Sequence, residues 1–169
     1  VGDTCRLTLD GNEQYRSAEA FREAWERFKT DDDVQWLMDH LIFVEQPFHR
    51  DVALSAELGE ELRQWEQRPA MIIDESDGEI ESLPEGLRLG FHGTSHKNCK
   101  GIFKGLANAC LLEKRRREHP DQPALLSGED LANVGPVALT QGLCVMATLG
   151  ITHVERNGHH YFAGLSNYP

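Results

Sequence analysis

The chain has few cysteines, no long apolar run and no recognisable targeting segment. Its four cysteines show no paired CxxC spacing, so we expect free thiols in a reducing, cytoplasmic compartment and no zinc site. The apolar runs are far shorter than the roughly 20 residues that a membrane-spanning helix needs. No signal-peptide pattern follows Val1. The sequence therefore predicts a soluble protein without a membrane partner.

Positive charge is also scarce, because 17 basic residues stand against 28 acidic ones and give a formal net charge of −11. This balance argues against a nucleic-acid partner and against an anionic membrane surface. The one basic run, Lys114–Arg117, is interpreted as the solvated end of a helix, where the helix dipole favours cations. The chain also lacks a P-loop and a GxGxxG motif, which disfavours an open-sheet phosphate-binding domain.

The apolar run Leu41–Val44 leads directly into Glu45, and Pro47 then ends it. Its length and its β-branched and aromatic residues predict a strand that is buried on both faces. The carboxyl end of such a strand is where α/β proteins place their chemistry; the alternative is that Glu45 only faces solvent. Two other short runs repeat the pattern, namely residues 5–10, which end in Asp10, and residues 70–74, which end in Asp74.

Six predicted strands alternate with predicted helices along the chain: residues 5–10, 41–45, 70–74, 93–97, 124–127 and 151–155. This α/β alternation predicts a parallel sheet with helices outside it. A closed eight-stranded barrel typically needs roughly 250 residues, and this chain has 169. The sequence therefore predicts either an open six-stranded sheet or the later six βα units of an incomplete TIM-type (β/α) barrel, its third to eighth strands.

The acids at the first three strand ends form a candidate metal site. The carboxyl ends of parallel strands meet at one edge, so we expect Asp10, Glu45 and Asp74 to converge. Three adjacent carboxylates repel one another unless a cation neutralises them, and hard oxygen ligands suit Mg²⁺. The next strand ends in Lys97, and a lysine beside a divalent cation has a lowered pKa, which suits a general base for a C–H proton.

The last predicted strand ends in Glu155, with His153 two residues earlier on the same face. Glu155 is either a site residue or a salt-bridged glutamate, and His153 is either a proton relay or a hydrogen-bonded core histidine. Together, the strand ends predict a metal that binds a substrate carboxylate and a lysine that removes the α-proton. The metal would then stabilise the charge of the resulting enediolate.

These segments resemble the enolase superfamily, in its mandelate racemase and muconate-lactonizing branch, over nearly the whole chain. The resemblance implies that Asp10, Glu45 and Asp74 bind Mg²⁺. It also implies that Lys97 is the base and that Glu155 contacts the substrate carboxylate or acts as an acid. The segments that carry it are LTLDGNEQY, IFVEQPF, MIIDES, SHKNCKGIFKGLANA and ITHVERNG, which are similar to the third, fourth, fifth, sixth and eighth strand segments of that family.

Two positions stay open within this resemblance. Glu75 is an alternative to Asp74, and because the strand period of two lets only one of them face inward, we predict Asp74. Between Lys97 and Ile102 the chain is one residue shorter than the usual double-glycine form, so Lys100 is a rival base.

The resemblance also implies that residues 1–169 are the C-terminal part of the catalytic barrel of a longer protein. The first barrel strands and the N-terminal capping domain would lie upstream of Val1. The implied activity is Mg²⁺-dependent abstraction of the proton α to a carboxylate, as in a racemase or epimerase, a cycloisomerase or an acid-sugar dehydratase, by a homo-oligomeric isomerase or lyase. We expect this part alone to be inactive. The alternative is a catalytically silent barrel that binds a carboxylate ligand or serves in assembly.

Four other polar stretches are interpreted mainly as structural, although each invites a functional reading. They are a turn asparagine that could orient a ligand (Asn12), an acidic helix start (Asp31–Asp33), a βα turn with a capping acid (Ser127–Asp130) and a surface loop (His159–Tyr161).

Overall fold

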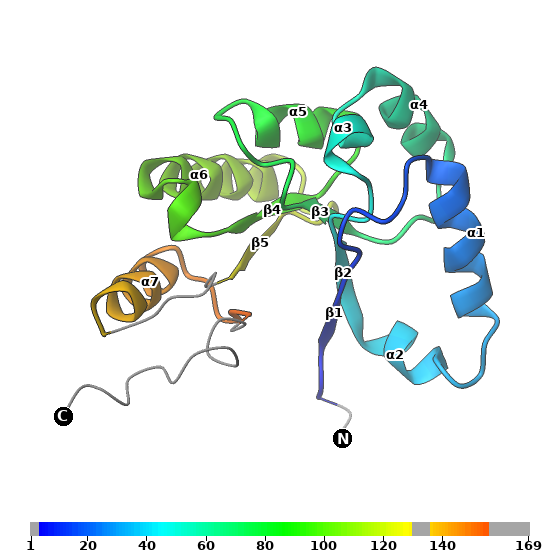
Figure 1. The fold of residues 1–169 in the computed structure, drawn as a ribbon, viewed down its shortest axis with the longest axis horizontal. Coiled ribbons are helices and arrows are strands. Elements are labelled where there is room, and N and C mark those ends of the chain that lie inside the picture. Colours follow the sequence, from blue (N-terminus) through cyan, green and yellow to red (C-terminus); the bar gives the residue numbers. More distant parts are fainter. Residues whose placement is uncertain (1–3, 130–135, 156–169) are drawn as a thin grey trace. The chain divides into compact units, whose positions relative to one another are not determined.

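The computed structural model describes residues 4–129 and 136–155 of the chain, which separates into two units, Val1–Gly93 and Thr94–Pro169. Strands and helices alternate through both units (Figure 1). The predicted α/β class is therefore confirmed. None of the helices in the described ranges combines the length and the apolar character that crossing a membrane would require.

Unit 1 contains a parallel sheet of three strands in chain order, namely β1 (Leu7–Asp10), β2 (Leu41–Glu45) and β3 (Met71–Ile73). The register pairs Asp10 with Glu45 and Glu45 with Ile72. The predicted bounds of β2 are confirmed, whereas β1 starts two residues later than predicted and β3 is one residue shorter at each end. Next to β3, the N–H of His92 donates to the carbonyl of Met71 at 2.7 Å, just before the next strand begins.

Five helices accompany these strands: α1 (Ala18–Lys29), α2 (Gln35–His40), α3 (Arg50–Ala53), α4 (Ala56–Gln64) and α5 (Ser82–Leu89). The Ser17 hydroxyl accepts a hydrogen bond from Ala20 and caps α1. The chain between β2 and β3 forms two helices, because the Ser55 hydroxyl accepts the Leu58 N–H and starts α4. Asp31–Asp33 lie exposed in the turn before α2, as the structural interpretation requires.

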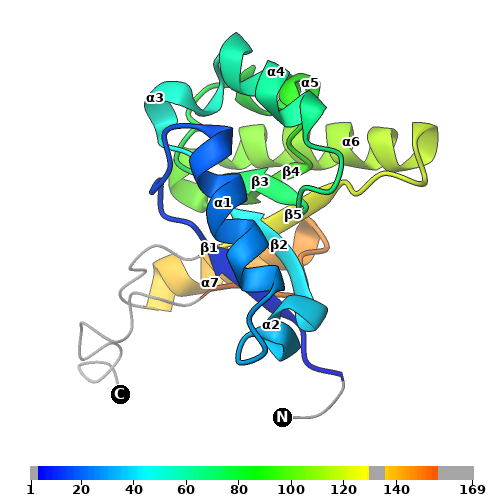
Figure 2. The same cartoon turned by 90° about the vertical axis from the view of Figure 1, so that its right-hand side faces the viewer.

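Aromatic side chains form the centre of the unit 1 core. The ring of Phe21 on α1 meets Phe48 and Trp65 edge-on, with ring centroids 5.5 and 5.6 Å apart. This packing, together with Val44, holds α1 and α4 against the sheet (Figures 1 and 2). Because such rings bury large apolar areas, they supply much of the stability that keeps the strand ends in place.

The central strand β2 is buried on both faces only in its second half. Phe43 and Val44 are fully buried, as predicted, but Ile42 keeps 37% of its surface exposed. The prediction is therefore confirmed for the half of β2 that leads into Glu45 and wrong for the half that precedes it.

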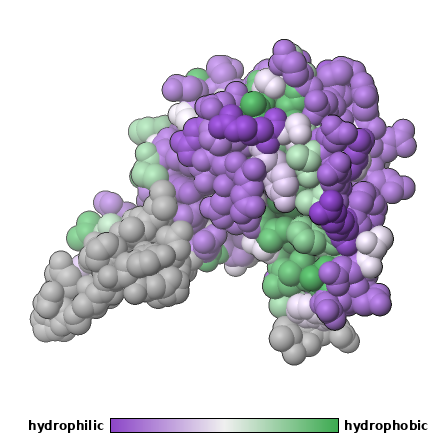
Figure 3. All heavy atoms as spheres, turned by 45° about the vertical axis from the view of Figure 1, so that its right-hand side comes forward, coloured by the Kyte–Doolittle hydropathy of each residue, from purple (hydrophilic) through white to green (hydrophobic). Residues whose placement is uncertain are grey.

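On the face shown in Figure 3, most visible side chains are hydrophilic, and apolar ones gather mainly in one area.

Unit 2 contains β4 (Gly93–His96), the 3₁₀-helix η1 (Asn98–Lys100), α6 (Ile102–Glu118), β5 (Leu125–Gly128) and α7 (Pro136–Thr148). The N–H of Glu129 donates to the carbonyl of His96 at 3.0 Å, so the ends of β4 and β5 are neighbours. Helix α6 packs closely on β4, because a Cβ atom at Gly105 would lie only 2.4 Å from the His96 ring.

The sixth predicted strand, Ile151–Glu155, is not a strand in the described residues. Only Glu155 pairs there, in an isolated parallel bridge with Glu129, where its N–H donates to the carbonyl of Gly128 at 2.9 Å. One ladder contact is too little to define a strand. The prediction of six strands is therefore wrong for the described part of the chain, which contains five.

Candidate functional site

Two of the three predicted metal ligands are buried side by side at the strand ends of unit 1. Carboxylate oxygens of Glu45 and Asp74 lie within 4.8 Å of each other, and only 6% and 4% of these residues is exposed. Asp10 is the register partner of Glu45 and therefore projects from the same face, although it is more exposed. The alternative in which Glu45 faces solvent is wrong.

The loops that follow β1 and β2 are joined by backbone hydrogen bonds. The N–H of Gly11 donates to Glu45 at 2.7 Å, and the N–H of Tyr15 donates to Pro47 at 3.0 Å. A Cβ atom at Gly11 would lie 2.6 Å from the Cα atom of Pro47, so only glycine permits this approach. The two loops therefore hold the ends of β1 and β2 in a defined relation.

Backbone strain is concentrated at the same strand ends. In the described residues, the non-glycine residues with positive φ are Asn12 (44°), Glu13 (60°) and Gln46 (33°). Asn12 and Glu13 come shortly after the predicted ligand Asp10, and Gln46 comes directly after the predicted ligand Glu45. Such strained conformations persist only where the surrounding structure enforces them, and they cluster at functional sites. This observation supports a site at this edge independently of the acids.

The side chain of Gln46 connects the end of β2 to the segment that follows β3. Its Oε1 accepts hydrogen bonds from the N–H groups of Asp74, at 2.7 Å, and Ser76, at 3.2 Å. Its Nε2 donates to the carbonyl of Phe48 at 2.6 Å and to the Ser76 hydroxyl at 2.7 Å. No local pattern in the sequence marks Gln46, because its role depends on a segment about thirty positions away.

Glu75, the alternative to Asp74, has an environment that disfavours a negative charge. Burial raises the pKa of its carboxyl, and the nearby negative charges of Asp74, Asp10 and Glu13 raise it further. A backbone hydrogen bond lowers the pKa but does not cancel this increase. Within the described residues, its Oε2 is buried without a hydrogen-bond donor. A bound cation would relieve both effects, so Glu75 is an alternative third ligand to Asp74.

One cation already lies beside these acids, on the first turn of α3. The guanidinium of Arg50 donates to both carboxylate oxygens of Glu13, through Nε and Nη2, at 2.7 Å each. This pairing lowers the pKa of Glu13 to about 2. Asn12 donates its backbone N–H to Asp10 at 2.9 Å, which agrees with the turn interpretation of that residue.

Taken together, the donors of unit 1 suit a hard divalent cation. Glu45 and Asp74 offer adjacent buried carboxylates, Asp10 is the register partner of Glu45, and the charges of Asp10 and Asp74 act on Glu75. Oxygen-only donor sets of this kind favour Mg²⁺ or Ca²⁺ over zinc or copper.

Unit 2 contains a buried ion pair at its own strand ends. The Nζ of Lys97 lies 2.5 Å from an oxygen of Glu129, and each side chain is only 9% exposed. Lys97 directly follows β4, and Glu129 directly follows β5. From the sequence alone, Glu129 is interpreted as part of a turn. The sequence pattern that marks the other strand ends is also present here, because the short run Leu125–Gly128 is followed directly by the acid Glu129.

Lys100, the rival base, lies on η1, and its Nζ donates to the backbone carbonyl of Ser95 at 3.1 Å. Lys97 is the more deeply buried of the two lysines. Lys97 also forms the ion pair with Glu129, whereas Lys100 bonds to a backbone carbonyl.

The last segment of unit 2 brings two more predicted residues near β5. The Nε2 of His153 lies 3.2 Å from the hydroxyl of Ser127, and Glu155 bridges to Glu129 through the backbone. Ser127 and Glu129 alternate along β5 and therefore share one face. His153 is therefore hydrogen-bonded, but it is exposed rather than in the core, and Glu155 is exposed as well.

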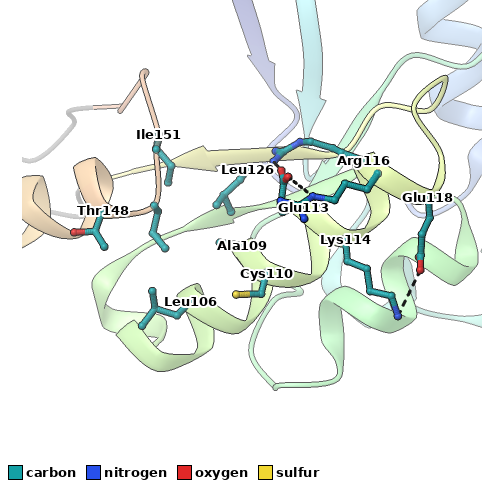
Figure 4. Close-up of a pocket in the computed structure, with 13 residues that line it drawn as sticks. Leu106, Ala109, Cys110, Glu113, Lys114, Arg116, Glu118, Leu126, Thr148 and Ile151 are labelled. Carbon is teal, nitrogen blue, oxygen red and sulfur yellow. Dashed lines mark hydrogen bonds and ion pairs between the residues drawn. The ribbon is translucent and has the colours of Figure 1, made fainter.

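A cavity of about 680 Å³ lies in unit 2 between α6, the end of α7 and β5, where Leu126 and Ile151 contribute to its wall (Figure 4). Its charged residues pair with one another, since Glu113 binds both Arg116 and Arg117, and Lys114 lies 3.7 Å from Glu118. None of the predicted site residues lines this cavity. The interpretation of the basic run as a solvated helix end is confirmed.

The residues Asp130 and His159–Tyr161 lie outside the described residues. A scan of the chain against protein-family models gives no match, and a search of curated proteins gives none either. The function is therefore argued from the chemistry of the site.

Proposed function

We propose that the protein is a Mg²⁺-dependent enzyme that removes the proton α to a substrate carboxylate. The observation that carries this proposal is the pair of buried carboxylates of Glu45 and Asp74, whose oxygens lie within 4.8 Å. Two such groups repel each other in a low-dielectric environment and suit a divalent cation between them.

The proposal includes the fold family. The order of parallel strands in unit 1, each followed by helices and ending in an acid, supports the assignment of residues 1–169 to the later part of a TIM-type barrel. We assign it to the enolase superfamily, in its mandelate racemase and muconate-lactonizing branch, on the strand-end motifs of its sequence.

In this proposal Asp10, Glu45 and Asp74 hold the metal, with Glu75 as the alternative third ligand. Mg²⁺ would supply the positive charge that binds the substrate carboxylate and stabilises negative charge on it after proton loss. The strained backbone at Asn12, Glu13 and Gln46 would hold these ligands in position.

Lys97 is the proposed base, and its Nζ would accept the α-proton. Its burial favours the neutral amine, whereas Glu129 favours the ammonium form while orienting it. The proposed base belongs to unit 2 and the proposed metal ligands belong to unit 1. Glu155, with His153 on the same segment, is the proposed contact to the substrate carboxylate or the proton donor.

The test is exchange of the substrate α-proton with solvent deuterium, measured by NMR in the full-length protein with Mg²⁺ and a panel of α-substituted carboxylic acids. We expect Lys97→Ala to slow exchange by about 10²- to 10⁴-fold, the usual contribution of a general base. Lys100→Ala is the matched control and should retain exchange. Unchanged exchange in Lys97→Ala would show that this residue is not the base.

A second function is favoured by one observation, the ion pair of Lys97 with Glu129. A lysine that stays protonated beside a carboxylate cannot act as a base but can bind an anionic group. The alternative is thus a catalytically silent barrel that binds a carboxylate ligand. Binding of a carboxylic acid without any α-proton exchange in the same panel would favour this alternative.

A further inference from the structure

The side chain of Gln46 is completely buried, and its backbone has a φ of 33°. It comes directly after the proposed ligand Glu45 and directly before Pro47. A non-glycine residue with positive φ is unfavourable by about 1–3 kcal/mol, so the surrounding contacts must hold it there.

The side-chain hydrogen bonds of Gln46 go to the loops that follow β2 and β3. Its Oε1 accepts the N–H groups of Asp74 and Ser76, and its Nε2 donates to the Phe48 carbonyl and the Ser76 hydroxyl. All four distances are between 2.6 and 3.2 Å. The side-chain amide of Gln46 therefore bonds to the backbone of the proposed ligand Asp74. Gln46 is also the residue that directly follows the proposed ligand Glu45, so it links the two ligands.

The segment that Gln46 holds lies beyond the end of β3. Strand β3 ends at Ile73, and residues 74–76 form a bend and turn rather than a continuation of the sheet. The Gln46 Oε1 accepts the N–H of Asp74 at 2.7 Å and that of Ser76 at 3.2 Å, so the shorter bond goes to the residue that carries the proposed ligand.

We propose that Gln46 is a positioning residue for the metal site, which sets the separation of the Glu45 and Asp74 carboxylates to suit a small divalent cation. This inference rests on the proposed function, because it assumes that these carboxylates bind Mg²⁺. Groups that hydrogen-bond around metal ligands commonly contribute 10- to 100-fold to metal affinity. Mg²⁺ requires a near-ideal geometry at short distances, whereas Ca²⁺ accepts a looser one.

The experiment measures binding of Mg²⁺ alone and Ca²⁺ alone to the full-length protein by isothermal titration calorimetry. Gln46→Met keeps the approximate size of the side chain and removes all four hydrogen bonds. We expect it to weaken Mg²⁺ binding by about 10- to 100-fold and Ca²⁺ binding by clearly less. Ser76→Ala removes a single bond and should weaken Mg²⁺ binding by a smaller factor in the same direction.

The control is Leu62→Ala, which removes a fully buried side chain of the aromatic core. It should lower the free energy of unfolding while leaving the ratio of the Mg²⁺ and Ca²⁺ dissociation constants unchanged. A role of Gln46 in folding alone would give the same result for Gln46→Met.

The outcomes separate the two proposals. Binding of Mg²⁺ by the wild type with an unchanged ratio in both Gln46→Met and Ser76→Ala would overturn the positioning role and leave the proposed function standing. Absence of Mg²⁺ binding in the wild type would overturn the proposed function and this inference together. If Gln46→Met does not fold, Ser76→Ala decides between these outcomes.

Discussion

Arg50 and Glu13 are joined by three hydrogen bonds across two loops. The guanidinium donates two bonds of 2.7 Å to the carboxylate of Glu13, and the backbone N–H of Arg50 donates a third, of 2.8 Å. Glu13 lies in the loop after β1, and Arg50 begins α3 after β2. The pair therefore ties together the two loops that follow the proposed ligands Asp10 and Glu45.

The first prediction concerns the acid stability of this pair. The Arg50 guanidinium lowers the pKa of Glu13 from its usual 4.5 to about 2. A lowered carboxyl pKa stabilises the folded protein above pH 4.5, and this contribution disappears as the pH falls from 4.5 to 2. Arg50→Ala should therefore lower stability at neutral pH and flatten the loss of stability in that acid range.

The measurement is the midpoint of urea unfolding between pH 2 and pH 7. Arg50→Lys is the matched control, because it keeps the positive charge but cannot form the two-bond contact with Glu13. It should give an intermediate profile. If Arg50→Ala has the same acid profile as the wild type, the pair does not contribute to folding.

The second prediction concerns the contact between the loops at Gly11. A Cβ atom at this position would lie 2.6 Å from the Cα atom of Pro47, and a backbone atom cannot move aside as a flexible side chain can. Gly11→Ala should therefore lower the free energy of unfolding by about 1–3 kcal/mol, the usual range for overpacking.

Gly78→Ala is the control for this substitution, since a Cβ atom at Gly78 would meet nothing within 4 Å. Chemical denaturation of both variants under the same conditions checks the prediction. An equal effect of the two substitutions would show that the approach of Gly11 to Pro47 does not limit the packing of these loops.

The third prediction concerns the buried pair in unit 2. The side chains of Lys97 and Glu129 are each 9% exposed, with Nζ and carboxylate 2.5 Å apart. Breaking a buried ion pair by removing one partner is strongly destabilising, whereas replacing both by apolar residues is much less so. Glu129→Gln should therefore lower the free energy of unfolding by about 3 kcal/mol.

The double variant Lys97→Met with Glu129→Leu should be more stable than Glu129→Gln alone. Urea unfolding of Lys97→Met, Glu129→Leu and the double variant, as a thermodynamic cycle, measures the coupling of the two side chains. Additive losses would mean that the two side chains do not interact in the folded protein. Glu60→Gln removes the partner of Arg63 in an exposed pair and should change stability little.

Local patterns predicted much of what surrounds the site. The run Leu41–Val44 followed by Glu45 predicted the bounds of β2, because apolar content and a following proline act on the segment itself. The cap at Ser17 was likewise predictable from neighbouring residues. The wrong predictions came where distant partners decide, as in Ile151–Glu155, whose apolar residues suit a strand but which forms only one bridge.

The sequence by itself determined the α/β class and the placement of an acid at the end of each strand of unit 1, because strand length, burial and termination depend on residues close in the chain. Only the tertiary structure decided which groups those strand ends meet. Glu45 is buried beside Asp74 because β2 pairs with β3, a strand far along the chain, and Lys97 pairs with Glu129 because β5 returns beside β4. Such contacts depend on how the chain packs, which no local pattern specifies.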